Sequence, residues 1–193
     1  MALGWIGVAI MTVSQGATLA RIEPFASWNT PICWTGFILF ADSIVYRTRG
    51  ASWMRSSPRG FAMLALLSIP MWLVFEGYNR FIDNWYYTGL PENPPLRYFG
   101  YAWSFATIWP AIFEGADLCA VWRERRGYSR SVLIGHRIDT KRIGRVSIIA
   151  GAAMLIAPLL VPHPIARYLA APVWLGFTFL LDPINGRLGG ESL

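Results

Sequence analysis

Long apolar stretches without a charged residue limit the possible folds of this chain more than any other feature of its sequence. The first runs from Ala2 to Ala20, 19 residues without Asp, Glu, Lys or Arg. As a helix with a rise of about 1.5 Å per residue, it would cross the roughly 30 Å hydrocarbon core of a bilayer. Of all residues, 54% are hydrophobic and 15% charged, whereas about a quarter are charged in an average soluble protein. The chain is therefore predicted to be an all-α polytopic membrane protein.

About six transmembrane helices are expected. The predicted spans are 2–20, 28–46, 61–78, 100–122, 146–161 and a last one from residue 166 or 169 to 181. The first is interpreted as an uncleaved membrane helix, because no basic residues precede it and no small-residue cleavage site follows. Pro70 predicts a kink or local unwinding within the third span. Pro91, Pro94 and Pro95 are expected to exclude helix from the loop 79–99.

Positive charge, which gives a formal net charge of +6, lies in alternate loops. One group comprises Arg47, Arg49, Arg55 and Arg59, and the other Arg123, Arg125, Arg126, Arg130, Arg137, Lys141, Arg142 and Arg145. The positive-inside rule places these loops and both termini in the cytoplasm, as expected for a multi-pass protein of the bacterial cytoplasmic (inner) membrane. No basic surface interleaved with aromatic residues accompanies them, so nucleic acid is not an expected partner. Asp42 is expected to pair with an arginine near the headgroups.

A partial internal repeat links the second and sixth spans. The 19 residues from Trp34 align without a gap with those from Trp174, and eight positions are identical. The two copies would cross in the same direction, which indicates a parallel duplication of a four-helix unit. A shared helix-exit motif is the alternative. The predicted domains are 1–27, a first helix and outer loop; 28–165, a four-helix unit; and 166–193, the first helix of an incomplete repeat. The chain is then either a shortened member of a duplicated family or part of a longer polypeptide.

Aromatic and polar residues gather where the third span ends. Glu76 and Asn79 lie one helical turn apart, shortly before Trp85, Tyr86 and Tyr87. Asn79 and these three aromatic residues are candidate ligand-binding residues, which could wall a lipid, quinone or pigment pocket on the outer face. The alternative is an interfacial aromatic belt.

Carboxyl groups within predicted spans are the candidate catalytic residues. They are Glu114, Glu76 and Asp117, and burying each in hydrocarbon requires a partner or a cavity. Glu114 could be a general acid that protonates an isoprenoid-type lipid, or a proton or cation relay. It could also hydrogen bond to Asn79, Thr107 or Ser104 and hold the bundle together.

Two resemblances rest on these motifs. The combination of residues 75–79 (FEGYN), 84–87 (NWYY) and 181–185 (LDPIN) resembles uncharacterised duplicated multi-pass bacterial inner-membrane proteins. Their Trp-Glu-aromatic-x-Asn box is followed by Asn or Lys, Trp, x, Tyr, and Phe75 stands here in place of the box's Trp. This resemblance implies no activity. A weaker similarity, through Trp109, Pro110, Phe113 and Glu114, is to membrane-embedded lycopene cyclase domains, whose helices carry Pro-x-Glu-Glu followed by aromatic residues.

No metal site or cofactor motif is apparent in the sequence. Cys33 and Cys119 form no CxxC motif, and the only histidines, His136 and His163, are expected in loops. No cofactor is assigned. The leading hypothesis is a non-catalytic accessory subunit or scaffold that has the lipid bilayer and other membrane subunits as partners and could hold a lipidic ligand or pigment. The alternatives are an enzyme acting on an isoprenoid-type lipid, with Glu114 as acid, and a small transporter.

Overall fold

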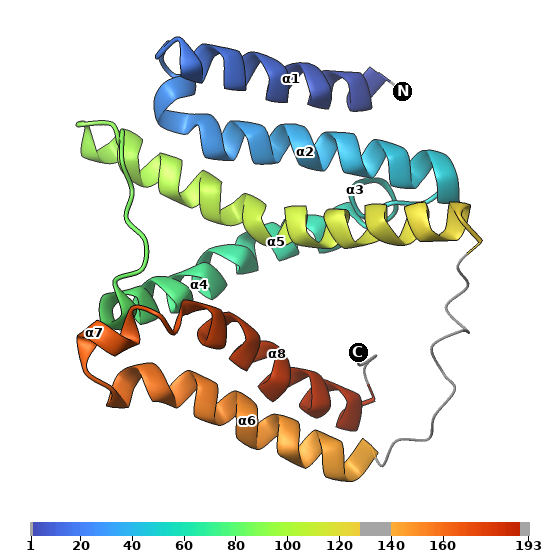
Figure 1. The fold of residues 1–193 in the computed structure, drawn as a ribbon. Coiled ribbons are helices and arrows are strands. Elements are labelled where there is room, and N and C mark those ends of the chain that lie inside the picture. Colours follow the sequence, from blue (N-terminus) through green and yellow to red (C-terminus); the bar gives the residue numbers. More distant parts are fainter. Residues whose placement is uncertain (1, 128–139, 190–193) are drawn as a thin grey trace. The chain divides into compact units, whose positions relative to one another are not determined.

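The computed structural model describes residues 2–127 and 140–189, which form an all-α protein without β-strands. The helices are α1 (Ala2–Leu19), α2 (Phe25–Arg49), α3 (Trp53–Ser56), α4 (Pro58–Ile82), α5 (Pro94–Arg125), α6 (Thr140–Leu160), α7 (His163–Ala166) and α8 (Ala170–Arg187) (Figure 1). The predicted all-α class is confirmed. Part of the second basic loop, with His136, lies outside the described residues, and His163 begins α7 instead of lying in a loop.

Three of the described helices are long and apolar enough to cross a membrane. They are α1, α4 and the part of α6 from Ile143 to Leu160. In the most apolar 18-residue stretch of each helix, at most 17% of the residues are buried, so most of the apolar side chains face outward. Outward-facing apolar surface is what a lipid environment favours. Length and composition thus agree with the prediction for three spans, and the spans assigned to α2, α5 and α8 stay predictions.

The amino-terminal end of α5 lies earlier in the chain than the sequence predicted. The helix begins at Pro94, and the side chain of Asn93 accepts a hydrogen bond from the Leu96 backbone N–H at 3.3 Å. Proline fits the first turn of a helix, because the backbone N–H that it lacks would have no intrahelical acceptor there. The expectation that prolines exclude helix up to residue 99 is therefore wrong for 94–99.

Proline also fails to unwind α4. The helix continues without interruption through Pro70 from Pro58 to Ile82. The local unwinding predicted at Pro70 is therefore wrong, and a kink there stays a prediction. The fifth predicted span is likewise part of a longer helix, since α6 has 21 residues.

The chain divides into two compact units. One comprises Met1–Leu73 and Tyr87–Arg130, and the other Val74–Tyr86 and Ser131–Leu193. In the first unit α2 packs against both α1 and α5 (Figure 1). In the second, α6 packs against α8. The three-part division expected from the repeat stays a prediction.

Glycines bring one helix pair of each unit into close contact. In the first unit, a Cβ atom built on Gly7 of α1 would lie 2.8 Å from the Phe40 backbone N of α2. In the second, a Cβ atom on Gly151 of α6 would lie 2.5 Å from the Leu180 backbone N of α8. Small residues of this kind let helix backbones approach closely, which is typical of helix pairs in membranes.

Candidate functional site

Asn79 closes the carboxyl-terminal end of α4. Its Oδ1 accepts hydrogen bonds from the backbone N–H groups of Asn84 at 3.0 Å and Trp85 at 3.3 Å, and its Nδ2 donates to the Trp85 carbonyl at 2.7 Å. The chain turns at Asp83, whose φ of 47° lies in the left-handed region. One amide side chain thus holds the segment that leaves the helix.

Glu76 takes part in the same closure. Its Oε1 accepts a hydrogen bond from the Trp85 indole Nε1 at 3.1 Å. In the same segment, the Asn84 Nδ2 donates a hydrogen bond to the Arg167 carbonyl at 3.1 Å. Glu76, Asn79 and Trp85, three of the predicted site residues, therefore lie together. The contacts between them position backbone and indole groups, so the geometry gives this motif a structural role at the helix end.

Two tyrosines follow this closure in the sequence. Tyr86 is 84% exposed, and Tyr87 belongs to the other compact unit. There the Tyr87 ring lies 5.4 Å from that of Tyr101, and its hydroxyl accepts a hydrogen bond from the Trp72 Nε1 at 3.4 Å. A wall made jointly by Trp85, Tyr86 and Tyr87 stays a prediction.

Glu114 is the most unusual ionisable group among the described residues. It is fully buried in α5, and neither carboxyl oxygen has a hydrogen-bond partner within the described part of the chain. The predicted hydrogen bonds from Glu114 to Asn79, Thr107 or Ser104 are therefore wrong. The Thr107 hydroxyl instead donates within α5, to the Ser104 carbonyl at 2.8 Å.

A second buried carboxyl group, that of Asp42, faces the same region from α2. Contacts on either side, Thr35 with Trp103 and Arg49 with Asp117, place Asp42 beside Pro110, one turn before Glu114. Unlike Glu114, Asp42 has partners, because it accepts from the Met54 backbone N–H at 3.2 Å and pairs with the Arg55 Nε at 3.3 Å. The expected pairing of Asp42 with an arginine is confirmed, and that arginine is Arg55.

Asp117 and Glu124 share Arg49, which lies just beyond the predicted span of α2. The Arg49 guanidinium donates to Asp117 at 2.8 Å and to both carboxylate oxygens of Glu124 at 2.6 and 3.3 Å. These hydrogen bonds raise the pKa of Arg49 above its ordinary value, and the bond that Arg49 donates to Glu124 contributes most. The same hydrogen bond lowers the pKa of Glu124. The network ties the ends of α2 and α5 together, and it engages Asp117 in an ion pair.

Pro110 lies in α5 one turn before Glu114, and Ser68 of α4 bridges two backbone groups beside this proline. The Trp109 backbone N–H donates to the Ser68 hydroxyl at 3.1 Å, and this hydroxyl donates to the Phe105 carbonyl. A hydroxyl inserted between residues four apart is a recognised way to satisfy backbone groups beside a proline in a membrane helix. Sequence reasoning missed Ser68, although Pro110 was a signal that some donor or acceptor must come from elsewhere.

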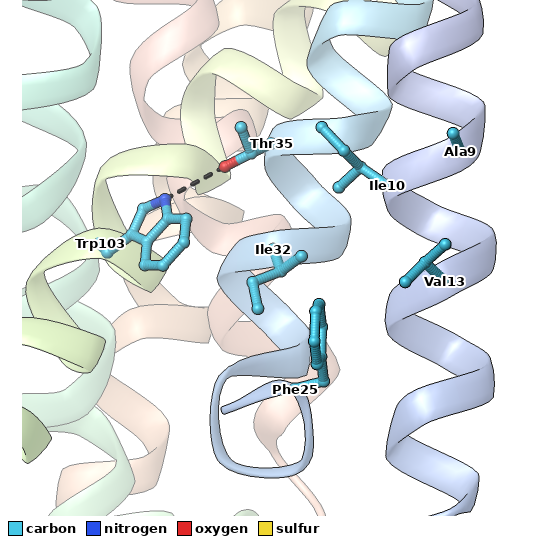
Figure 2. A pocket seen from close by; sticks show the side chains of 7 residues that line it. All are labelled: Ala9, Ile10, Val13, Phe25, Ile32, Thr35 and Trp103. Carbon is cyan, nitrogen blue, oxygen red and sulfur yellow. Dashed lines mark hydrogen bonds between the residues drawn. The ribbon is translucent and has the colours of Figure 1, made fainter. Parts of the chain in front are cut away.

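An apolar cavity lies in the first unit (Figure 2). It has a volume of about 480 Å³. Its lining residues come from α1, α2 and α5 and are Ala9, Ile10, Val13, Phe25, Ile32, Thr35 and Trp103. The two polar side-chain groups among them satisfy each other, since the Trp103 indole Nε1 donates to the Thr35 hydroxyl at 3.1 Å.

The Thr35 hydroxyl in turn donates to the Pro31 carbonyl at 2.7 Å. No polar group of this wall is left to bind a polar ligand. Glu114 does not line this cavity. Within the described residues, no group of three or more His, Cys, Asp or Glu side chains is placed to hold a metal ion. No family model, curated protein or solved structure matches the chain.

Proposed function

We propose that this chain is a multi-pass protein of the bacterial inner membrane with six spans and both termini in the cytoplasm. Three apolar helices with outward-facing side chains support the membrane location. The alternation of basic and neutral loops supports the number of spans and the orientation.

The proposal includes a parallel duplication, in which α2 and α8 are equivalent helices. Its support is the aligned sequence together with one feature of packing. Gly36 of α2 packs against Gly7 of the helix before it, and Gly176 of α8 packs against Gly151 of α6. Gly36 and Gly176 are equivalent in the alignment, and each lies at a close contact between two helices. The resemblance to duplicated multi-pass bacterial proteins fits this arrangement.

The function that the geometry favours is that of a non-catalytic scaffold or accessory subunit that holds a hydrocarbon chain. One observation carries this proposal: the cavity of Figure 2 has apolar walls, and its polar groups are already paired. Such a site offers no group for acid, base or nucleophilic chemistry, but it suits the tail of a lipid, quinone or pigment. The candidate residues Glu76 and Asn79 also support a non-catalytic role, because their side chains hydrogen bond to Trp85 at the end of α4.

The test is the identity of the molecules that remain with the protein after gentle extraction from native membrane. Ile32→Trp places a larger side chain in the cavity, and Leu66→Trp makes a similar change on the exposed face of α4, where Leu66 is 69% exposed. We expect native mass spectrometry to show a bound apolar molecule in the parent and in Leu66→Trp, and at least a tenfold loss in Ile32→Trp. Equal retention by both variants would refute a ligand in this cavity. Stoichiometric partner proteins in the same preparation would support the subunit role.

An enzyme acting on an isoprenoid-type lipid is the second candidate function, and the unpaired carboxyl group of Glu114 favours it. A carboxylic acid kept away from water is suited to protonate an apolar double bond. The expected assistants are otherwise engaged, Glu76 with Trp85 and Asp117 with Arg49. Glu114→Gln would abolish turnover of a prenyl substrate and leave the fold intact if this candidate is right, whereas unchanged turnover would exclude Glu114 as the acid.

A further inference from the structure

A second cavity lies between α1 and α2, and it combines apolar walls with two hydrogen-bond donors. Its volume is about 220 Å³. Trp5, Val8 and Phe40 contribute apolar walls, and Ser43 and Arg47 contribute the donors. It shares no lining residue with the cavity of Figure 2.

The Ser43 hydroxyl is buried and has no hydrogen-bond partner among the described residues, and Ser43 as a whole is 8% exposed. Helical hydroxyls usually avoid this state by bonding the carbonyl one turn earlier. Thr35 and Thr48 on the same helix do so, at 2.7 and 3.0 Å from the carbonyls of Pro31 and Ile44. Ser43 instead lines the cavity with a hydroxyl that has no acceptor competing with a bound molecule.

Gly4 of α1 leaves the space in front of this hydroxyl. A Cβ atom at Gly4 would lie 3.1 Å from the Ser43 Cβ and 3.5 Å from its Oγ. Glycine therefore avoids a tight contact of α1 with the Ser43 side chain at this wall of the cavity.

Arg47 follows Ser43 by one helical turn and lines the same cavity. It is exposed, and its five N–H donors allow it to bind an anion in addition to its other contacts. A hydroxyl and a guanidinium on one helix face form a site for phosphate oxygens, and guanidinium groups bind phosphate in a bidentate manner.

We propose that this cavity binds an anionic phospholipid. The phosphate accepts hydrogen bonds from the Ser43 hydroxyl and the Arg47 guanidinium, and the first part of an acyl chain lies against Trp5, Val8 and Phe40. Basic pockets between membrane helices on the cytoplasmic side bind anionic headgroups in this way. The proposal rests on the proposed membrane placement and deepens the lipid-holding role by adding a second, charge-selective site.

The experiment measures lipid retention by the full chain in nanodiscs that contain phosphatidylglycerol and phosphatidylcholine in equal amounts. Native mass spectrometry counts the phosphatidylglycerol molecules that remain after release. We expect Arg47→Gln and Ser43→Ala each to lower retention about tenfold, because each removes a hydrogen bond to a charged group. Arg59→Gln removes a positive charge from the same predicted loop and is expected to retain the lipid. Excess inorganic phosphate should not displace the lipid, because phosphate alone lacks an acyl chain.

Other outcomes would overturn the proposal. Equal losses in Arg47→Gln and Arg59→Gln would show that net charge alone attracts the lipid. Unchanged retention in Ser43→Ala, or release by inorganic phosphate, would show that the cavity holds no lipid. Ile32→Trp separates this site from the cavity of Figure 2. If that variant loses its apolar ligand while Ser43→Ala and Arg47→Gln keep phosphatidylglycerol, the proposed function stands and this site is refuted.

Discussion

Replacing Glu114 by leucine should stabilise this protein, although buried carboxyl groups in membrane helices usually support the fold. Glu114 is fully buried, and its oxygens have no hydrogen-bond partner among the described residues. A buried polar group in that state costs about 1–3 kcal/mol. Leucine removes this cost and introduces an imperfect fit that costs about 1 kcal/mol. The net expectation is a gain of about 1 kcal/mol in the free energy of unfolding.

Asp42→Leu is the matched control, because Asp42 is equally buried but has partners. Its removal leaves the Met54 backbone N–H and the Arg55 guanidinium without a carboxylate. We expect a loss of about 2 kcal/mol, reduced by the partial exposure of Arg55. The two substitutions are expected to change the free energy of unfolding in opposite directions, which distinguishes an unpaired carboxyl group from a paired one.

The measurement is reversible unfolding of the protein in mixed detergent micelles, followed by the fluorescence of its ten tryptophans. A loss of more than about 1 kcal/mol in Glu114→Leu would refute the reasoning, since it would mean that the carboxyl group makes a favourable contact. Glu114→Met, which has an unbranched apolar side chain, shows whether a small effect comes from shape instead of polarity.

Three further predictions concern other contacts. Ser68→Ala should lower the free energy of unfolding by about 1–3 kcal/mol, measured in the same way, because it leaves the Trp109 backbone N–H without its acceptor. Gly151→Ala should separate α6 from α8 and weaken thermal stability, whereas alanine at the open position Gly77 should not. Arg49 lowers the pKa of Glu124 in the folded chain, so this pair contributes stability above the ordinary glutamate pKa of 4.5 and loses it as the pH falls through the lowered value. Glu124→Gln should remove that part of the pH dependence at and below pH 4.5, and an unchanged profile would contradict the assignment.

The sequence predicted the helical class and much of the grouping of polar residues, because both depend on spacing along one element. Glu76 and Asn79 were expected beside Trp85, and they are. Their role at the helix end could not be predicted, because it depends on how the chain turns at Asp83. The backbone of Asp83 is left-handed, and no periodicity in the sequence indicates this.

Partners on other helices were predicted poorly. The burial of Glu114 followed from its place in an apolar stretch, but its expected partner Thr107 uses its hydroxyl within α5. Local side-chain bonds to the backbone compete with contacts between helices, and sequence spacing does not show which will form. The early start of α5 was missed because Pro94 was read as a helix breaker, although its effect depends on its position within the helix.

The Ser68 hydroxyl that bridges Trp109 and Phe105 of α5 has a consequence for biogenesis. A helix released into lipid with an open backbone ladder is poorly stable, because no water is available there to satisfy the free groups. In a chain synthesised from its amino terminus, α4 precedes α5, so Ser68 is already available when residues 105–109 leave the ribosome. With the proposed membrane placement, a circular permutation that delivers α5 before α4 would leave the Trp109 backbone N–H without the Ser68 hydroxyl until α4 follows.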